Sequence, residues 1–185
     1  MPLAYSVGSI PDLYRKLERE SYRAYHADSP MHKADHFFNF CVTAHSMRDY
    51  CLEHLGLILD SDKQPFYEVW NAVPLLVAVQ EIANSSKHYV LRNSKNKIVK
   101  ALKTRTVRSR YSTFVDIYEN EQKDCKFVLV KRPDVSVTLS DGKVFLLSQF
   151  THEVMEYWRS YLLKHGIKLR RQSLRTLIGS SPRMS

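Results

Sequence analysis

Hydrophobic side chains recur at helical spacing over most of the chain, and the longest run covers residues 35–59. When the residues are placed about 100° apart around a helix, nine apolar side chains of this run fall on one continuous arc, with polar residues opposite. This pattern predicts a core helix over 35–59, which either is capped by Gly56 or runs through it to Leu59. The arc consists of Phe37, Phe40, Cys41, Ala44, Met47, Cys51, Leu55, Ile58 and Leu59.

Two more stretches carry the same periodicity. A helix is predicted over 10–27, where Pro11 lies at a position that favours the first turn of a helix. Another helix is predicted over 74–91, with Pro74 in its first turn.

The last predicted helix begins near Thr151, whose hydroxyl can cap it, and ends at Gly166. The polar segment 60–64 and the following Pro65 are expected to form a turn between the second and third helices. These four long helices predict a helical bundle.

The hydrophobic period changes to two over about 126–148. Alternate positions are hydrophobic in three short runs, and Asp141 and Gly142 lie between the last two runs, where this dipeptide favours a hairpin turn. We therefore predict a small antiparallel β-meander inserted into the bundle. The predicted fold is mainly α, with one helical domain over 1–167 that includes the meander, followed by a basic, flexible tail over 168–185.

The composition fits one globular domain. With 185 residues, 44% of them hydrophobic, the chain has enough apolar material for a core. No apolar run approaches the roughly 18 to 20 residues that a membrane span needs, and the N-terminus lacks the order of a secretory signal. The three cysteines are an odd number, so we expect reduced, buried thiols rather than disulfides. These features predict a cytoplasmic protein that has no membrane partner.

The formal net charge of +9 is concentrated in two segments. Residues 92–113 hold eight Lys or Arg and no acid, and seven more follow Glu156, again without an acid. This distribution suggests RNA or another polyanion as a partner, and the alternative is a solvated connector and tail. We expect residues 93–113 to form a basic connector, either a mobile loop or an irregular extended segment. The candidate nucleic-acid contacts are Lys95, Lys97, Lys100, Lys103, Arg105, Arg108, Arg110, Arg170 and Arg171.

The sequence lacks motifs for metal, nucleotide or covalent chemistry. His36, His45 and His54 are nine residues apart, which puts successive members on opposite sides of a helix. The five glycines form neither a phosphate-binding loop nor a dinucleotide-binding motif, and no nucleophile motif occurs. We therefore expect neither a metal nor a cofactor.

Arg48 is the exception on the apolar arc of 35–59. It projects between Ala44 and Leu55, where a guanidinium needs a partner or an exit to water. His54 follows six residues later. An arginine, a polar neighbour and a histidine at this spacing resemble the motif of the HEPN superfamily, a group of small helical bundles that includes metal-independent ribonucleases.

The resemblance implies a ribonuclease-like site around Arg48. In that family the arginine holds the scissile phosphate, the histidine acts as acid or base, and the site is completed across a homodimer. A guanidinium suits phosphate and an imidazole titrates near neutral pH, so the two residue types fit this chemistry. Glu81, Asn84 and His88 lie within about 60° of one another on the predicted third helix and could supply further polar groups.

Each candidate also has a structural interpretation. Arg48 could pair with Glu81 or Asp49, or lay its stem on apolar surface while its head reaches water. Glu81, Asn84 and His88 could form a solvated helix face. Three functions stay open: a HEPN-like nucleic-acid-associated protein that acts as a metal-independent ribonuclease, a non-enzymatic nucleic-acid-binding module, and a helical interaction or assembly subunit.

Overall fold

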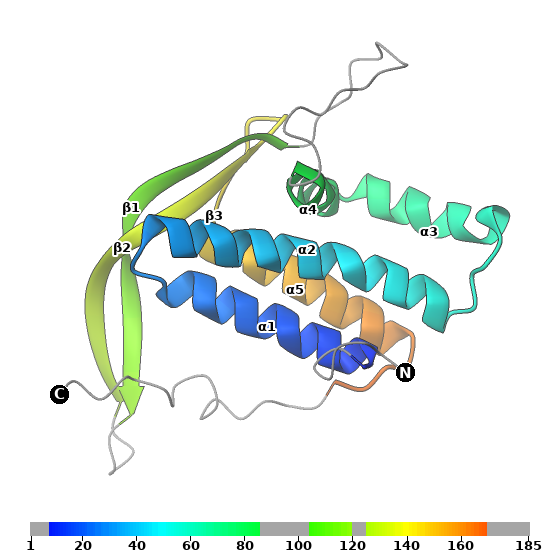
Figure 1. Ribbon diagram of the computed structural model, residues 1–185, viewed down its shortest axis with the longest axis horizontal. Helices are drawn as coiled ribbons and strands as arrows, with labels where there is room; N and C mark the ends of the chain where they lie inside the picture. The colour runs from blue at the N-terminus through cyan, green and yellow to red at the C-terminus, as the bar shows by residue number, and fades with distance from the viewer. Residues whose placement is uncertain (1–7, 86–103, 120–124, 170–185) are drawn as a thin grey trace.

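The computed structural model describes residues 8–85, 104–119 and 125–169, and its fold is mainly α (Figure 1). The predicted helical fold with an inserted antiparallel sheet is confirmed, and the sheet contains three strands in the order β1-β2-β3. In chain order the elements are α1 (Ile10–His26), α2 (Pro30–His54), α3 (Asp60–Ala72), α4 (Pro74–Ser85), β1 (Thr104–Glu119), β2 (Cys125–Leu139), β3 (Val144–Leu146) and α5 (Leu147–Lys164).

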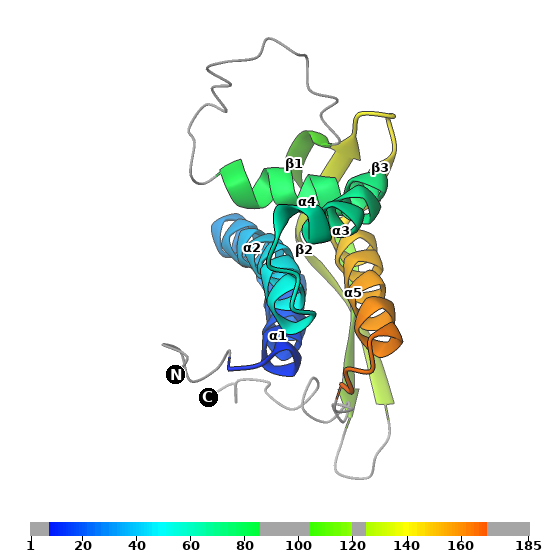
Figure 2. The same ribbon diagram turned by 90° about the vertical axis from the view of Figure 1, so that its right-hand side faces the viewer.

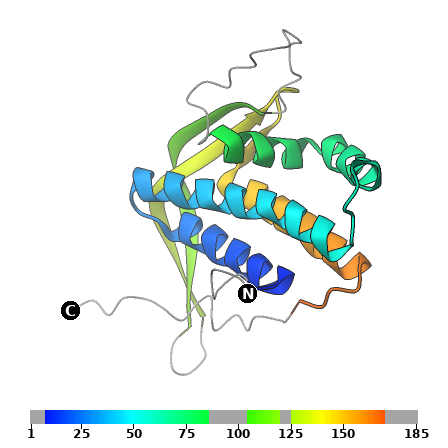
Figure 3. The ribbon, with the colours of Figure 1, turned by 45° about the vertical axis from the view of Figure 1, so that its right-hand side comes forward.

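Helices α1, α2 and α5 run side by side, with α3 and α4 beyond α2 on the side away from α1 (Figures 1 and 3). The β1–β2 hairpin is long (Figures 1 and 2). It curves past the turn that joins α1 to α2 (Figure 1). The core lies between the helices, because its five largest fully buried apolar side chains come from four of them. They are Leu17 of α1, Phe40 of α2, Trp70 of α3, and Phe150 and Trp158 of α5.

The ends of the first two helices follow from local signals. The Ser9 hydroxyl accepts a hydrogen bond from the Asp12 backbone N–H at 3.3 Å, and α1 has the predicted extent to within one residue. Helix α2 begins earlier than predicted, at Pro30, and ends at His54, in agreement with the alternative in which Gly56 caps it. Gly56 adopts a left-handed φ of 67°, which ends the helix. The expectation that Ile58 belongs to the core arc is therefore wrong, and its side chain is exposed.

Helix α3 occupies the segment for which we predicted a turn. Two carboxylates, Asp60 and Asp62, lie in its first turn, where their negative charge interacts favourably with the positive end of the helix dipole. Pro65 lies inside the helix and removes one backbone hydrogen bond. Phe66 and Trp70 are both buried one turn apart. Because burying these two rings stabilises the helix more than Pro65 weakens it, tertiary packing overrides the turn signal.

The last two helices agree with the predictions in part. Helix α4 begins at Pro74 as predicted and is described to Ser85, so the remainder of the predicted helix, including His88, lies outside the described residues. Helix α5 begins at Leu147 rather than near Thr151, which is buried inside the helix. Gly166, with a φ of 75°, follows the end of α5 as predicted.

The sheet is larger than the predicted meander. Residues 104–113, predicted as part of a loop or irregular connector, belong to β1, and residues 93–103 lie outside the described part. β1 pairs with β2 in an antiparallel register that places Val107 opposite Val137 and Phe114 opposite Val130. The non-local pairing with β2 makes this basic segment a strand, and local composition does not reveal such a pairing.

The described helices include none long and apolar enough to cross a membrane. The ranges 8–85, 104–119 and 125–169 therefore contain no helical membrane span.

The structure predicts very different reactivities for the three thiols. Cys41 and Cys51 are buried in α2, where burial raises the pKa of both thiols, that of Cys51 to about 12, whereas Cys125 is exposed. Only the thiolate reacts with alkylating reagents, so we expect one thiol to react quickly in the folded protein and three after unfolding in urea. Mass spectrometry after iodoacetamide treatment would count them. Cys125→Ser should leave no fast thiol, and rapid alkylation of Cys41 in the folded protein would contradict this prediction.

Candidate functional site

Arg48 lies on the side of α2 that faces α3 and α4. Its guanidinium carbon is 5.5 Å from the ring centre of Tyr67 and 5.9 Å from that of Trp70. Its Nε donates a hydrogen bond to Asp49 at 3.1 Å, and its Nη1 is 3.5 Å from Gln80 Oε1, at the limit of a hydrogen bond. The same Gln80 oxygen accepts a hydrogen bond from the Trp70 indole at 3.1 Å. Three helices therefore hold this arginine in place.

The Arg48 side chain is 19% exposed, so its guanidinium is neither fully buried nor free in water. Its carboxylate partner is the exposed Asp49, in agreement with one structural interpretation. Glu81 contacts the start of β1 instead, where its Oε2 accepts a hydrogen bond from the Thr104 backbone N–H at 2.8 Å. No acceptor for Nη2 of Arg48 occurs among the described residues. This nitrogen can therefore donate to a bound ligand.

The structure does not bring Arg48 and His54 together within one chain. His54 is the exposed last residue of α2. Six residues along a helix correspond to about 9 Å of rise and about 120° of rotation, so the two side chains point in different directions. A single phosphate group cannot contact both residues in this arrangement.

His45 lies closer to Arg48 on the helix surface. It precedes Arg48 by three residues, a spacing that puts both on one side of α2, and its ring centre is 6.1 Å from that of Trp70. The sequence places His45 among three evenly spaced histidines, and its spacing to Asp49 favours a local hydrogen bond on the helix. The spacing between Arg48 and His45 was the signal that could have identified it.

The predicted polar group on α4 is only partly described. Glu81 and Asn84 are half-buried, so they do not form the solvated face that was the alternative interpretation. Glu81 joins the end of α4 to the start of β1 through Thr104, which is a structural role. His88 lies outside the described residues.

Two of the predicted nucleic-acid contacts have described side chains. Arg108 and Arg110 are exposed at alternate positions of β1, so they lie on one face of the strand. Arg110 Nε is 4.0 Å from Asp134 Oδ2, which leaves most of the guanidinium available. The side chains outside the described part are those of Lys95, Lys97, Lys100, Lys103, Arg105, Arg170 and Arg171.

A polar cluster between α1 and α2 was absent from our sequence-based candidates. The Glu20 carboxylate accepts hydrogen bonds from Arg23 Nη1 at 2.9 Å and from His36 Nδ1 at 3.0 Å. Nearby, Lys16 Nζ donates to the Thr43 hydroxyl at 2.6 Å. Lys16, Glu20 and Arg23 recur at helical spacing on α1, which was the available signal, but their partners on α2 could not be identified from the sequence.

Metal ligands do not converge in the described part of the chain, where no group of three or more His, Cys, Asp or Glu could hold a metal ion. The protein is mainly α and carries a half-buried arginine, Arg48, on an aromatic surface formed by Tyr67 and Trp70. No protein-family model matches the chain, and neither a curated protein nor a solved structure matches it significantly.

Proposed function

We propose that the protein is a HEPN-like nucleic-acid-associated protein in which Arg48 binds a phosphate group of RNA. The observation that carries the proposal is the position of the Arg48 guanidinium, held against Tyr67 and Trp70, with no acceptor for Nη2 among the described residues. Aromatic rings fix the guanidinium at low entropic cost, and its planar set of donors matches phosphate oxygens.

The charge distribution supports the same proposal. A net charge of +9 attracts a polyanion, and Arg108 and Arg110 offer exposed guanidinium groups for further phosphate contacts. A cytoplasmic location, where the thiols stay reduced, is part of the proposal.

A metal-independent ribonuclease is the enzymatic form of this function. A histidine would accept the proton of a ribose 2′-hydroxyl, whose oxygen attacks the phosphorus while Arg48 balances the developing charge. The bond between the phosphorus and the 5′-oxygen breaks, the 5′-oxygen takes a proton from water or from the protonated histidine, and a 2′,3′-cyclic phosphate remains. His54 of the same chain points elsewhere, so the candidates for this histidine are His45, one turn before Arg48, and His54 from a second copy in a homodimer. The non-enzymatic form needs only the phosphate contact.

Incubation of the purified protein with labelled RNA in EDTA separates the two forms. We expect Arg48→Ala to lower the cleavage rate about tenfold or more, because the charge on the phosphate loses its partner. Arg159→Ala, which removes an exposed arginine of α5, is the control and should leave the rate unchanged. The melting temperatures must match. Binding without any cleavage by the wild type would overturn the ribonuclease and leave the binding module.

An assembly subunit is the second candidate function, and the outer face of the β1–β2 hairpin favours it. Two cross-strand pairs, Val115 with Leu129 and Ile117 with Phe127, are all exposed on this face. A second copy could cover this apolar ladder in a homodimer. Light scattering of the wild type and of Leu129→Lys tests this candidate, and a monomeric wild type at high concentration would contradict it.

A further inference from the structure

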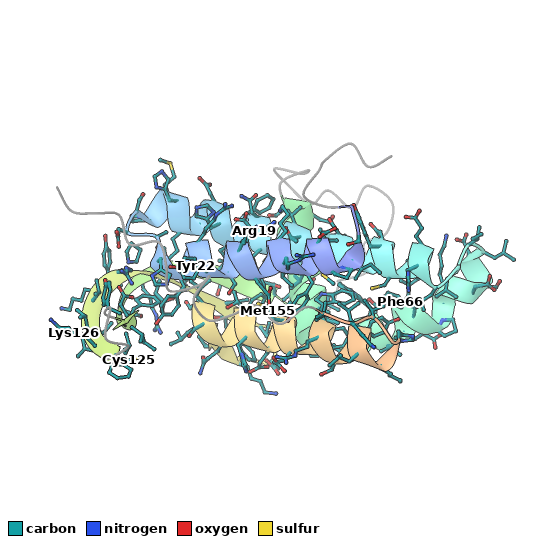
Figure 4. All side chains as sticks on the ribbon, turned by 90° about the horizontal axis from the view of Figure 1, so that it is seen from below. Arg19, Tyr22, Phe66, Cys125, Lys126 and Met155 are labelled. Atoms are coloured by element: carbon teal, nitrogen blue, oxygen red, sulfur yellow. The ribbon has the colours of Figure 1, made fainter. Side chains whose placement is uncertain are left out.

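An open polar pocket runs along α1, distinct from the Arg48 site. It has a volume of about 480 Å³, and we call it the α1 basic pocket. Figure 4 looks onto the molecule from the α1 side and labels Arg19 on this helix. The pocket is lined by Asp12, Arg15, Lys16, Arg19, Glu20 and Arg23.

The lining has an excess of positive charge. Its four cations face two carboxylates, which gives a formal charge of +2. Arg15 pairs with Asp12 at 2.7 Å and Arg23 with Glu20 at 2.9 Å. Arg19 forms no ion pair with a residue of the described part. This excess of charge suits an anion, because part of the cationic lining is not neutralised within the protein.

Glu20 fixes two of the groups around the pocket. Its side chain is almost fully buried, 5% exposed, and its two oxygens accept from Arg23 and from His36 of α2. A carboxylate only accepts, so the Nδ1 of His36 carries the proton in this bond. In the neutral ring, Nε2 is then an acceptor, and no described residue donates a hydrogen bond to it. Glu20 is therefore a positioning residue for both Arg23 and His36.

From this geometry we propose that the α1 basic pocket and His36 bind a ribose-phosphate unit of RNA, with the cations on the phosphate and His36 Nε2 accepting from the ribose 2′-hydroxyl. The proposal rests on the proposed function and names its substrate class. The 2′-hydroxyl is the donor that DNA lacks. A site that offers an acceptor for this hydroxyl discriminates against a ligand without it.

Lys16 of the pocket lining is also held in place by hydrogen bonds. Lys16 Nζ is held 2.6 Å from the Thr43 hydroxyl, which itself donates to the Asn39 carbonyl at 2.7 Å. This chain of hydrogen bonds keeps the ammonium group of Lys16 beside α2. A phosphate in the pocket would therefore meet in Lys16 a cation whose side chain is already held in place, which reduces the entropic cost of binding.

Arg23 and Arg159 form a matched pair for the test. Both are about half exposed, with side-chain exposures of 53% and 55%, and each pairs with a glutamate three residues earlier, at 2.9 Å and 3.6 Å. Arg23 lines the α1 basic pocket and Arg159 does not. Removal of each arginine takes away the same net charge, but Glu20, the partner of Arg23, is buried, whereas Glu156, the partner of Arg159, is about half exposed. The melting temperature of Arg23→Ala therefore has to be measured beside its affinity.

The experiment measures fluorescence anisotropy of labelled RNA and DNA of one sequence, about ten nucleotides long, at about pH 8, where free imidazole is neutral. We expect Arg19→Ala and Arg23→Ala to weaken binding of both nucleic acids about threefold to tenfold, and Arg159→Ala less than twofold. Wild type should prefer RNA about threefold to tenfold, and His36→Ala should lose this preference. Thermal melts check that each variant is folded.

The outcomes separate this inference from the proposed function. Suppose that Arg48→Ala weakens RNA binding, but that Arg19→Ala, Arg23→Ala and Arg159→Ala all change the affinity equally. The proposed role of the α1 basic pocket is then wrong and the proposed function stands. Equal affinity of the wild type for RNA and DNA overturns the role of His36. If the wild type binds no RNA, both proposals fail.

Discussion

Arg132→Ala is expected to lower the free energy of unfolding by about 3–5 kcal/mol, because it leaves a buried carboxylate without its main partner. Arg132 of β2 is buried, and both of its terminal nitrogens donate to Asp116 of β1 at 2.6 Å. Its Nε donates to Asp28 at 2.8 Å, in the turn between α1 and α2. One side chain thus joins both hairpin strands to the helical layer.

The environment of Asp116 explains the size of this effect. The carboxylate is almost fully buried, and the hydrogen bonds from Arg132 hold the pKa of Asp116 below its ordinary value. After the substitution, only Tyr118, at 3.3 Å, and His26, at 3.7 Å, would remain close to the carboxylate among the described residues. Neither replaces a bidentate guanidinium, so the Asp116 carboxylate would either stay charged and buried at a high cost in free energy or take up a proton.

Urea unfolding followed by circular dichroism measures the loss. Arg108→Ala, which removes an exposed arginine of β1, is the control and should change stability by less than about 0.5 kcal/mol. The double variant Asp116→Leu with Arg132→Met should lose less than Arg132→Ala alone, because it leaves no unpaired charge. A loss below about 1 kcal/mol for Arg132→Ala would contradict this account of the hairpin.

Because of Lys33, the free energy of unfolding is expected to rise by about 2–3 kcal/mol with increasing pH, which is the opposite direction to the effect of most surface lysines. Its side chain is fully buried, with Nζ donating to the Tyr25 carbonyl at 3.0 Å and lying 4.3 Å from the ring centre of Phe114. Burial lowers the pKa of Lys33 from 10.5 to about 8. Between these two values the unfolded chain binds the proton and the folded protein does not. Stability from this group therefore rises as the pH increases from 8 towards 10.5.

Comparison of the wild type with Lys33→Met isolates this effect. The raised pKa values of Cys41 and Cys51 make stability fall with increasing pH over an overlapping range, but both proteins share them. We expect the wild type to gain about 2–3 kcal/mol relative to Lys33→Met between about pH 7.5 and pH 10.5. Urea titrations at the two pH values measure the difference, and parallel pH profiles would show that Lys33 keeps an ordinary pKa.

Residues that favour helix ends and the hydrophobic periodicity predicted the elements that depend mainly on neighbouring residues in the sequence. Pro11 and Gly166 marked the start of α1 and the end of α5, and the apolar arc of α2 identified a core helix. Helix α3 was missed because Pro65 and a polar segment outweighed two aromatic side chains whose burial partners are distant in sequence. β1 was missed because its partner strand begins beyond the hairpin tip and its basic residues resembled a solvated connector.

One part of the candidate site could be predicted from the sequence, and another part depends on the tertiary fold. The sequence indicated that Arg48 would meet apolar side chains, and the structure agrees, with Tyr67 and Trp70 against the guanidinium. Helical periodicity could not identify Gln80, because which helix packs on that side of α2 depends on the tertiary fold. The contact between Glu20 and His36 also joins two different helices, so their spacing in the chain contains no signal for it.

Binding of a labelled single-stranded RNA to the wild type and to Arg48→Ala tests the central claim most directly. We expect the wild type to bind RNA at about 50 mM salt, with an affinity that falls steeply by about 200 mM. Arg48→Ala should bind about tenfold more weakly at an unchanged melting temperature, because a charge-assisted hydrogen bond to phosphate is lost. If the wild type fails to bind RNA at low salt, or if Arg48→Ala binds as tightly as the wild type, Arg48 is a structural arginine and the proposed function is wrong.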